Sequence, residues 1–162
     1  MGIEFLDKFF LAICDRIYVM HKMFYVSGFI YHPPTQQILL HQQSLNSTAS
    51  SWSLFGEQHD ETIQPEVIFN KVVSKLLNKQ LSEIYPIYSY TDDTSNSTQS
   101  LLYAILEELE EFPPKNGHTF QWFTFKELVK LPINEQTKHD IVVGQRVIEA
   151  AGRKERGEHT FQ

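Results

Sequence analysis

Paired strand-like segments and only two long helical patterns follow one another along this chain without a regular rhythm. Residues 23–32 and 37–43 are rich in aromatic and aliphatic side chains and flank a Pro-Pro-Thr-Gln turn, which predicts a β-hairpin. Residues 84–90 and 100–109 form a second pair around a polar loop, and the later segment could itself end as loop. Because no strand–helix–strand repeat links these segments, their order predicts an α+β fold or an α/β sandwich with a mixed β-sheet.

Two helical patterns complete the predicted domain. In the first, Pro65 suits a first helical turn, where its missing N–H is not needed, Thr62 just upstream is a suitable cap, and Asn78 is a suitable end. Residues 134–152 form a terminal helix, which follows a short strand at 119–123 and a helical turn. On the terminal helix we expect a buried side made of Ile141, Val142, Val147 and Ile148.

The predicted domain covers residues 23–152 and is flanked by two shorter segments. Residues 1–22 carry apolar side chains at three- and four-residue steps, which is typical of an amphipathic helix. We expect this accessory helix to dock on the domain rather than to anchor the chain to a membrane or a partner. Residues 153–162 show no apolar period and are predicted to form a polar tail. The apolar stripe of the accessory helix consists of Ile3, Leu6, Phe10, Ile13, Ile17 and Met20.

The charge and cysteine content argue against several classes of partner. A formal net charge of −6 disfavours binding to nucleic acids or anionic membranes, whose phosphates are held mainly by Lys and Arg. The longest apolar run near the N-terminus, residues 9–14, is far shorter than the ~20 residues that span a bilayer. The single Cys14 allows neither an internal disulfide nor a thiolate zinc cluster, so a reducing cytoplasm is the expected location.

A Trp-Ser-Leu-Phe-Gly-Glu segment at residues 52–57 precedes the first helix, and residues 121–131 precede the terminal helix. Together with the hairpin and the strands, this order resembles the Nudix hydrolase family over residues 23–152. The family signature is G-x5-E-x7-R-E-U-x-E-E-x-G-U, where U is a bulky aliphatic residue, and a W-x-L-P-G segment usually precedes it. The resemblance implies an α/β/α sandwich with a mixed sheet, and hydrolysis of a nucleoside diphosphate linked to some moiety X.

The signature positions of this chain depart from the family pattern. Setting the lead-in on residues 52–56 places Glu57 at the first Gly of the signature and residues 71–78 on R-E-U-x-E-E-x-G. In the family, the helix glutamates hold divalent cations, usually magnesium, that bridge the diphosphate. Ile63 occupies the early glutamate position, Val72 the first helix glutamate, and Lys75 and Leu76 the adjacent pair, whereas Lys71 keeps the charge of the residue it replaces.

These replacements change the chemistry that the helix can perform. Positions 72, 75 and 76 share one helical face, where three carboxylates could converge on hard cations that prefer oxygen ligands. Valine and leucine supply no such ligand, and the ammonium group of Lys75 would repel a cation. We therefore expect no metal site by the standard motif, no cofactor, and a helix face that packs against the domain. The apolar arc that predicts this packing consists of Ile68, Phe69, Val72, Val73, Leu76 and Leu77.

Acidic residues around the preceding loop offer a relocated metal site as the alternative. A register slip of one or two residues would bring Glu61 near the early glutamate position, where it would act as a metal ligand with Glu57 and as the catalytic residue. Magnesium or manganese is expected only in that case. A solvated acidic loop, which includes Asp60 and Glu66, is the favoured interpretation.

A second acidic cluster lies just before Pro113 and Pro114. Some Nudix members take a further carboxylate from a late loop, so one of these side chains could act as a metal ligand or base. Four acids within five residues usually lie on the surface, and we favour that interpretation. The cluster consists of Glu107, Glu108, Glu110 and Glu111.

Residues for ligand contact are spread over the loop, the first helix and the second strand. In many relatives that strand ends in a basic residue, whereas here it ends in Gln43. His41 alternates with apolar residues and could face a cleft, but a half-buried, hydrogen-bonded histidine is favoured. The candidate ligand-binding residues are Glu57, Glu66, Lys71, Lys75, His41 and Gln43. Five aromatic residues could form a stacking wall for a nucleobase, but positions in the core are favoured for them. They are Trp52, Tyr88, Tyr90, Trp122 and Phe123.

Two functions from different classes follow from these observations. The favoured one is a Nudix-fold protein without metal-dependent diphosphate hydrolysis, which acts as a binding or regulatory module. Its partner would be a nucleotide-like small molecule or another protein, including a second copy of the chain. The alternative is a divergent Nudix hydrolase that uses relocated carboxylates, with water attacking phosphorus.

Overall fold

The structure of the chain, a computed structural model, describes residues 22–44, 50–60 and 63–158. Residues 1–21 lie outside these ranges, and with them the predicted accessory helix. None of the helices in the described ranges is long and apolar enough to cross a membrane. In chain order the elements are β1 (Met23–His32), β2 (Gln37–Gln43), β3 (Trp52–Ser53), β4 (Phe55–His59), α2 (Pro65–Leu77), β5 (Ile84–Asp92), β6 (Ser97–Ile105), β7 (His118–Thr124), α3 (Phe125–Leu128) and α4 (Glu135–Glu155).

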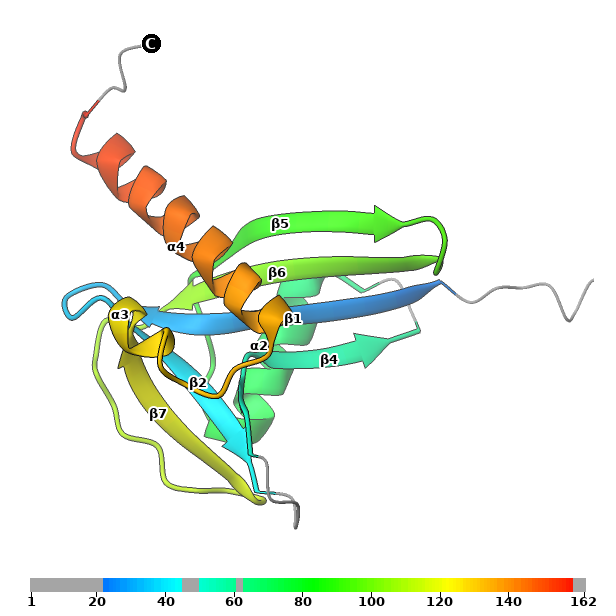
Figure 1. Ribbon diagram of the computed structural model, residues 1–162, viewed down its shortest axis with the longest axis horizontal. Helices are drawn as coiled ribbons and strands as arrows, with labels where there is room; N and C mark the ends of the chain where they lie inside the picture. Colours follow the sequence, from blue (N-terminus) through cyan, green and yellow to red (C-terminus); the bar gives the residue numbers. More distant parts are fainter. Residues whose placement is uncertain (1–21, 45–49, 61–62, 159–162) are drawn as a thin grey trace, which may run out of the picture.

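Strand β1 is the centre of the sheet, because it pairs along both of its edges (Figure 1). It runs parallel to β6 over its whole length up to Tyr31, and β5 adds to β6 in the antiparallel sense. Its other edge is shared, since β4 pairs with residues 24–28 and β2 pairs with residues 30–32, both antiparallel. Strands β3 and β7 extend the sheet from β2. The predicted mixed sheet is therefore confirmed.

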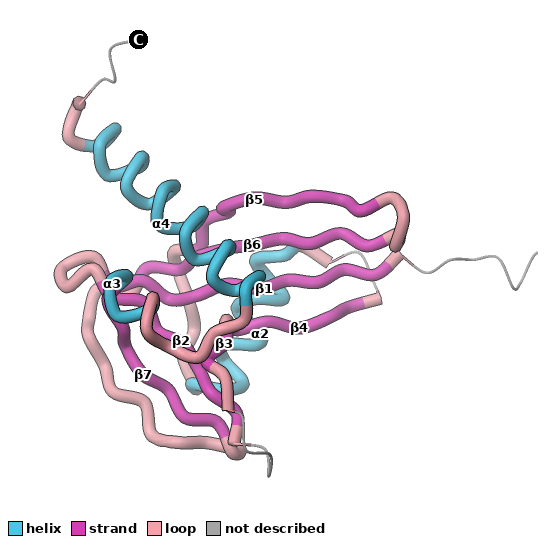
Figure 2. Tube along the Cα trace, in the orientation of Figure 1, coloured by secondary structure: helices cyan, strands magenta, loops and turns pink. Residues whose placement is uncertain are grey.

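Helices cover both faces of this sheet, with α2 behind it and α4 in front of it in Figures 1 and 2. Alternate strand residues point to opposite faces, and the buried residues accordingly form two clusters. Val26, Ile30 and Leu39 pack under α2, whereas Phe29 and Ile38 pack under α3 and α4. The predicted α/β/α sandwich of the α+β class is confirmed.

Two glycines allow the helices to approach β1 closely. A Cβ added to Gly28 would lie 2.5 Å from the carbonyl oxygen of Leu102 and 2.7 Å from the ring of Phe69 on α2. A Cβ added to Gly144 on α4 would lie 2.7 Å from the ring of Phe29 on β1. Because real Cβ atoms do not come that close, each aromatic ring occupies the space that a side chain would need.

The lead-in to α2 differs from the sequence prediction, which treats it as a loop. Residues 55–59 form β4, and Gly56 pairs with Ser27 on β1. The length of β1 explains this strand. The hairpin partner β2 pairs only with residues 30–32 of β1, so the N–H and C=O groups of the preceding residues of β1 need another partner on the same edge. A Cβ at Gly56 would lie 2.9 Å from the carbonyl oxygen of Val26. The lead-in is thus held in the sheet.

The terminal helix also differs in one respect from its prediction. Ile141 is buried, and Val147 and Ile148 pack against the same cluster, as predicted. Val142 is 46% exposed, so the prediction for this residue is wrong. The buried residues of α4, Thr137, Asp140, Ile141 and Gly144, share one face, and at 100° per residue Val142 points away from that face. The helix also continues to Glu155 rather than ending at residue 152.

Candidate functional site

The place of Pro65 and the end of helix α2 are as predicted, but the N-cap is Gln64 rather than Thr62. Pro65 occupies the first turn, and Asn78 ends the helix in the left-handed conformation with φ of 54°. The N–H of Asn78 donates to the carbonyl of Ser74 at 2.9 Å. Gln64, at the N-cap, makes no side-chain capping bond. The position of the helix therefore depends mainly on packing of its apolar face.

That apolar face lies on the sheet, as the sequence predicts. Val72 is only 8% exposed and belongs to the core cluster under α2, and Leu76 packs against the same cluster. Lys75 is exposed. The helix positions that the Nudix signature assigns to metal ligands thus present the buried isopropyl group of Val72, the ammonium of Lys75 and the apolar side chain of Leu76. These donors do not fit a divalent cation, which prefers oxygen ligands.

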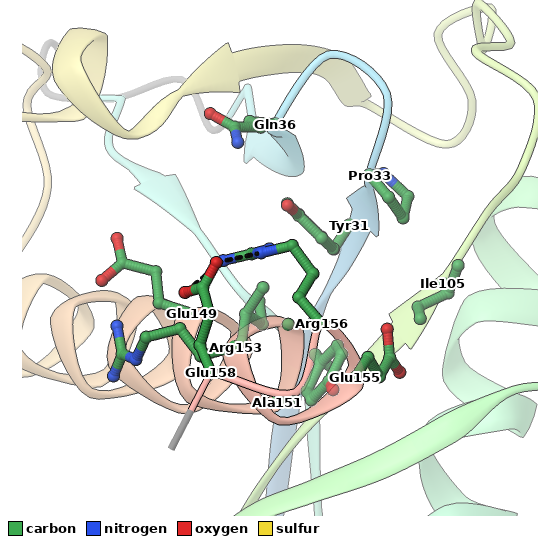
Figure 3. A pocket seen from close by; sticks show the side chains of 13 residues that line it. Tyr31, Pro33, Gln36, Ile105, Glu149, Ala151, Arg153, Glu155, Arg156 and Glu158 are labelled. Atoms are coloured by element: carbon green, nitrogen blue, oxygen red, sulfur yellow. Dashed lines mark hydrogen bonds and ion pairs between the residues drawn. The ribbon is translucent and has the colours of Figure 1, made fainter. Parts of the chain in front are cut away.

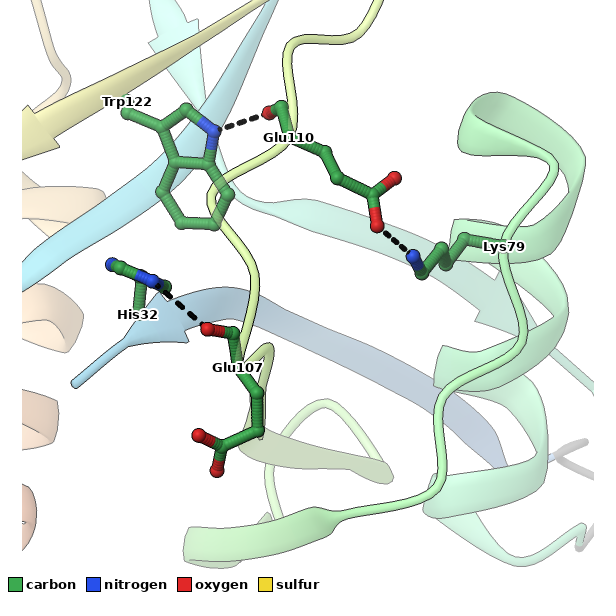
Figure 4. Close-up of polar contacts among 5 residues, drawn as sticks. All are labelled: His32, Lys79, Glu107, Glu110 and Trp122. Carbon is green, nitrogen blue, oxygen red and sulfur yellow. Dashed lines mark hydrogen bonds and ion pairs between the residues drawn. The ribbon is translucent and has the colours of Figure 1, made fainter. Parts of the chain in front are cut away.

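The linker between β6 and β7, residues 106–117, runs across the C-terminal end of α2. Lys115 donates from Nζ to the carbonyl oxygen of Lys75 at 3.0 Å. Leu76 and Pro113 line the same small cavity of about 180 Å³. Lys79, just beyond the helix, forms an ion pair with Glu110 (Figure 4). The linker therefore covers the end of the helix where the family places two of its glutamates.

Two side chains of the sheet, Trp122 and His32, fix the path of this linker by hydrogen bonds to its backbone (Figure 4). The indole Nε1 of Trp122 donates to the carbonyl of Glu110 at 2.8 Å. The imidazole Nε2 of His32 donates to the carbonyl of Glu107 at 3.2 Å, so Nδ1 is free to accept from the Thr35 hydroxyl at 2.8 Å. Side-chain donors from β1 and β7 thus hold the linker against the sheet.

The late acidic cluster follows its surface interpretation. Glu107, Glu108 and Glu111 are exposed, and Glu110 is half-buried with its carboxylate paired to Lys79. Within residues 22–44, 50–60 and 63–158, no three His, Cys, Asp or Glu side chains come together in a way that could hold a metal ion. The four acidic side chains of this cluster therefore lie at the surface, and one of them forms an ion pair.

Strand β4 brings Glu57 and His59 together on the α2 face of the sheet. Both alternate with Phe55, which lies in the core cluster under α2. The Nε2 of His59 lies 3.4 Å from Oε2 of Glu57. That nitrogen is buried and has no hydrogen-bond partner among the described residues. Glu61, the residue proposed as catalytic in a relocated site, lies outside the described residues, and Ile63 is 37% exposed.

Strand β2 places His41 on the same α2 face, since it alternates with the buried Leu39. Its Nε2 donates to the carbonyl of Leu54 at 2.9 Å, so Nδ1 accepts from Nδ1 of His118, 3.0 Å away. Burial is the main cause that lowers the pKa of His41 below 6.5; the hydrogen bond to Leu54 opposes the shift and His118 adds to it. His41 is therefore the half-buried, hydrogen-bonded strand residue that the sequence favours, and it links β2 to β7 and to the lead-in.

The remaining candidates do not converge on one point. Gln43, Lys71 and Lys75 are exposed, and Glu66 is half-buried in the first turn of α2. Among the described residues, no hydrogen bond or ion pair joins any two of the six candidate ligand-binding residues. The sequence does not predict a role for His59 or His118. His118 could be identified only from the register of β7 against β2, which sets it opposite Gln43.

Aromatic residues line a cavity of about 410 Å³ on the α2 face of β2 and β7. Phe112 comes from the linker, whereas Phe120 and Trp122 alternate along β7 opposite His41 and Leu39. Gln37 and Glu111 add polar atoms to the same wall. Of the residues considered for a stacking wall, Trp122 lies here, whereas Trp52 and Phe123 pack edge to face at 4.8 Å on the opposite side of the sheet. This arrangement can accept a flat, partly apolar group.

No protein-family model and no curated protein sequence matches the chain. Solved structures do match its fold. An ADP compounds hydrolase aligns with a TM-score of 0.63 at 10% identity, over 81% of this chain and 75% of its own. The NUDIX domain of NrtR from Shewanella oneidensis, complexed with ADP ribose, aligns with a TM-score of 0.58 at 16% identity, over 78% and 86%. A MutT structure, described for Aliivibrio salmonicida and Vibrio cholerae, aligns with a TM-score of 0.57 at 15% identity, over 78% and 98%.

Proposed function

We propose that this chain, which has the Nudix fold, is a binding module for a nucleotide-like ligand and does not hydrolyse diphosphates by the metal-dependent route. The ligand would occupy the aromatic cavity on the α2 face. The module needs no metal or other cofactor for binding. Because the chain carries a single cysteine and a net negative charge, the cytoplasm is its proposed location, and nucleic acids and membranes are not its proposed partners.

The burial of Val72 is the observation that carries this proposal. A glutamate at this position in a metal-dependent relative must reach a hydrated cation, whereas Val72 lies among Ile68, Phe69 and Val73 in the core. The neighbouring positions add an ammonium at Lys75 and an apolar contact at Leu76. Divalent cations require several oxygen ligands, so this face of α2 gives them none to bind.

The cavity supports the binding half of the proposal. Its volume of about 410 Å³ falls within the roughly 300–1,000 Å³ that is usual for small-molecule sites. Phe112, Phe120 and Trp122 offer apolar ring surface for a base, and Gln37 and Glu111 offer acceptors and a donor for its edge or for a ribose. The NrtR NUDIX domain that shares this fold was crystallised with ADP ribose. A Nudix fold is thus compatible with a complex of this chemical class.

Calorimetric titration with nucleotides tests this proposal when a chelator is present throughout. The panel consists of ADP, ATP, ADP ribose and a dinucleotide cofactor. At least one compound should bind saturably, and Phe112→Leu should weaken that binding about tenfold, because loss of a stacking ring costs roughly 1–3 kcal/mol. Tyr90→Leu is the matched control, since Tyr90 is an exposed aromatic residue outside the cavity and its loss should leave affinity unchanged.

Two results would contradict the ligand assignment. One is the absence of saturable binding by every compound in the panel, which would favour another protein, or a second copy of the chain, as the partner. The other is equal weakening by Phe112→Leu and Tyr90→Leu, which would place the ligand outside the aromatic cavity.

A divergent hydrolase is the second candidate function, and the pair Glu57 and His59 is the observation that favours it. The unpartnered Nε2 of His59 and the carboxylate of Glu57 lie 3.4 Å apart in the lead-in to α2. A relocated site would need further ligands, and Glu61 is the residue proposed to supply one. The binding module has more support, because His59 Nε2 is closed off from solvent.

A further inference from the structure

A second cavity of about 440 Å³ lies on the opposite face of the sheet from α2 (Figure 3). Its walls are the last turns of α4, the β1–β2 turn and the adjoining ends of β1 and β6. Neither the aromatic cavity nor any residue of the α2 face contributes to it. What this second cavity can bind is therefore independent of the proposed nucleotide site.

Two buried tyrosines line the second cavity. Tyr31 is 8% exposed and Tyr103 is 6% exposed, and their rings are fixed by contacts with Phe125 and with Phe29. Neither hydroxyl has a hydrogen-bond partner among the described residues, yet neither oxygen is closed off from solvent. Two largely buried tyrosines whose hydroxyls have no protein partner therefore offer a ligand in this cavity two fixed groups that can donate or accept a hydrogen bond.

The charges around the phenols favour a cation over an anion. Burial is the main cause that raises the pKa of Tyr31, and the carboxylate of Glu149 raises it further. Burial is also the main cause that raises the pKa of Tyr103, followed by Tyr85 and then by the carboxylate of Glu155. These carboxylates therefore set a negative potential at the hydroxyls. The C-terminal end of α4, which forms one wall, adds the negative end of the helix dipole.

Two arginines also line the cavity, and their charges are largely offset. The guanidinium of Arg156 donates from Nε and Nη2 to the carboxylate of Glu158 at 3.1 Å and 3.5 Å (Figure 3). Arg153 lowers the pKa of Glu158 as well, although Arg156 is the larger cause. With Glu149, Glu155 and Glu158 against Arg153 and Arg156, the lining carries a net charge of −1.

We propose that this cavity binds a small organic cation that carries an ammonium group on an alkyl body. The ammonium group would donate to the Tyr31 and Tyr103 oxygens and lie against Glu149 and Glu155, while the alkyl body contacts the apolar residues of the wall, Ile105 and Ile148. Tyrosine rings also attract cations through their electron-rich faces. The volume of about 440 Å³ suits a ligand of this size.

Calorimetric titration of the full chain with putrescine tests the inference. Butane-1,4-diol is the matched ligand, since it has the same carbon chain with hydroxyls in place of ammonium groups. Putrescine should bind saturably and the diol should not. The double variant Glu149→Gln/Glu155→Gln should weaken putrescine binding about fivefold or more, because two charge-assisted contacts lose their charge. Tyr31→Phe, which keeps the ring and removes only the hydroxyl, should also weaken it.

Glu135→Gln supplies the control for charge alone. Glu135 lies on the same helix, at its opposite end, and pairs with Lys138 outside the cavity. Its variant should bind putrescine as the unaltered protein does. The inference would be overturned if putrescine gave no saturable heat, if the diol bound equally well, if the double variant kept full affinity, or if Glu135→Gln weakened binding as much as the double variant.

Discussion

Replacing Val72 with glutamate should destabilise the protein by roughly 3–5 kcal/mol, the usual cost of an unpaired charge in a protein core. Val72 is 8% exposed and lies among Ile68, Phe69 and Val73. A carboxylate there would either lose its hydration or force α2 away from the sheet. The measurement is the free energy of unfolding from urea titration at neutral pH. This substitution restores the family residue, so it tests whether the helix face still suits a metal.

Val67→Glu is the matched control for this experiment. Val67 lies on the same helix, carries the same side chain and is 55% exposed. Its substitution should change the free energy of unfolding by no more than about 0.5 kcal/mol. Equal stability of the two variants would contradict the account, and so would stabilisation of Val72→Glu by magnesium, because both would show that residue 72 reaches solvent.

Replacing Gly28 with alanine should destabilise the protein by about 3 kcal/mol, the upper part of the usual range for overpacking a core. The new Cβ would lie 2.5 Å from the backbone oxygen of Leu102 and 2.7 Å from the ring of Phe69. The backbone oxygen cannot move without breaking the pairing of β1 with β6, and the ring of Phe69 is fully buried. The same urea titration gives the loss of stability.

Gly152→Ala provides the opposite expectation for the same substitution. Gly152 lies inside α4, and its nearest obstacle is the flexible end of Arg156 at 3.4 Å. Alanine there should raise the free energy of unfolding by about 0.5–1 kcal/mol, because glycine has the poorer helix propensity. A Gly28→Ala variant as stable as the unaltered protein would show that α2 does not rest on β1 at this point.

The parts of the fold that sequence could predict are those with a local cause. The apolar arc of α2, its Pro65 and its Asn78 all act within one helix, and each was found at its predicted place. Strand β4 was missed because residues 55–59 have weak strand propensity, with Gly56, Glu57 and Gln58 at their centre. Only the unpaired edge of β1, which is distant in sequence, makes this segment a strand.

The candidate site shows the same limit more strongly. The sequence predicts His41 as a hydrogen-bonded strand residue, as the structure has it, but its partner His118 is 77 positions away and their contact depends on the register of β7. The aromatic cavity requires Phe112 to meet Phe120 and Trp122, and that meeting depends on the path of the linker. Local patterns carry no information about such a path. The absence of carboxylates from positions 72, 75 and 76 of α2, by contrast, can be read from its residues alone.

Product release from nucleotide substrates is the measurement that tests the central claim most directly. The purified chain would be incubated with nucleoside triphosphates, dinucleoside polyphosphates, nucleotide sugars and dinucleotide cofactors, each with magnesium or manganese. The account predicts no phosphate or nucleotide product above the protein-free blank for any compound. Turnover that requires the metal, stops on chelation and is lost in Glu57→Gln or Glu61→Gln would contradict it and establish a relocated metal site.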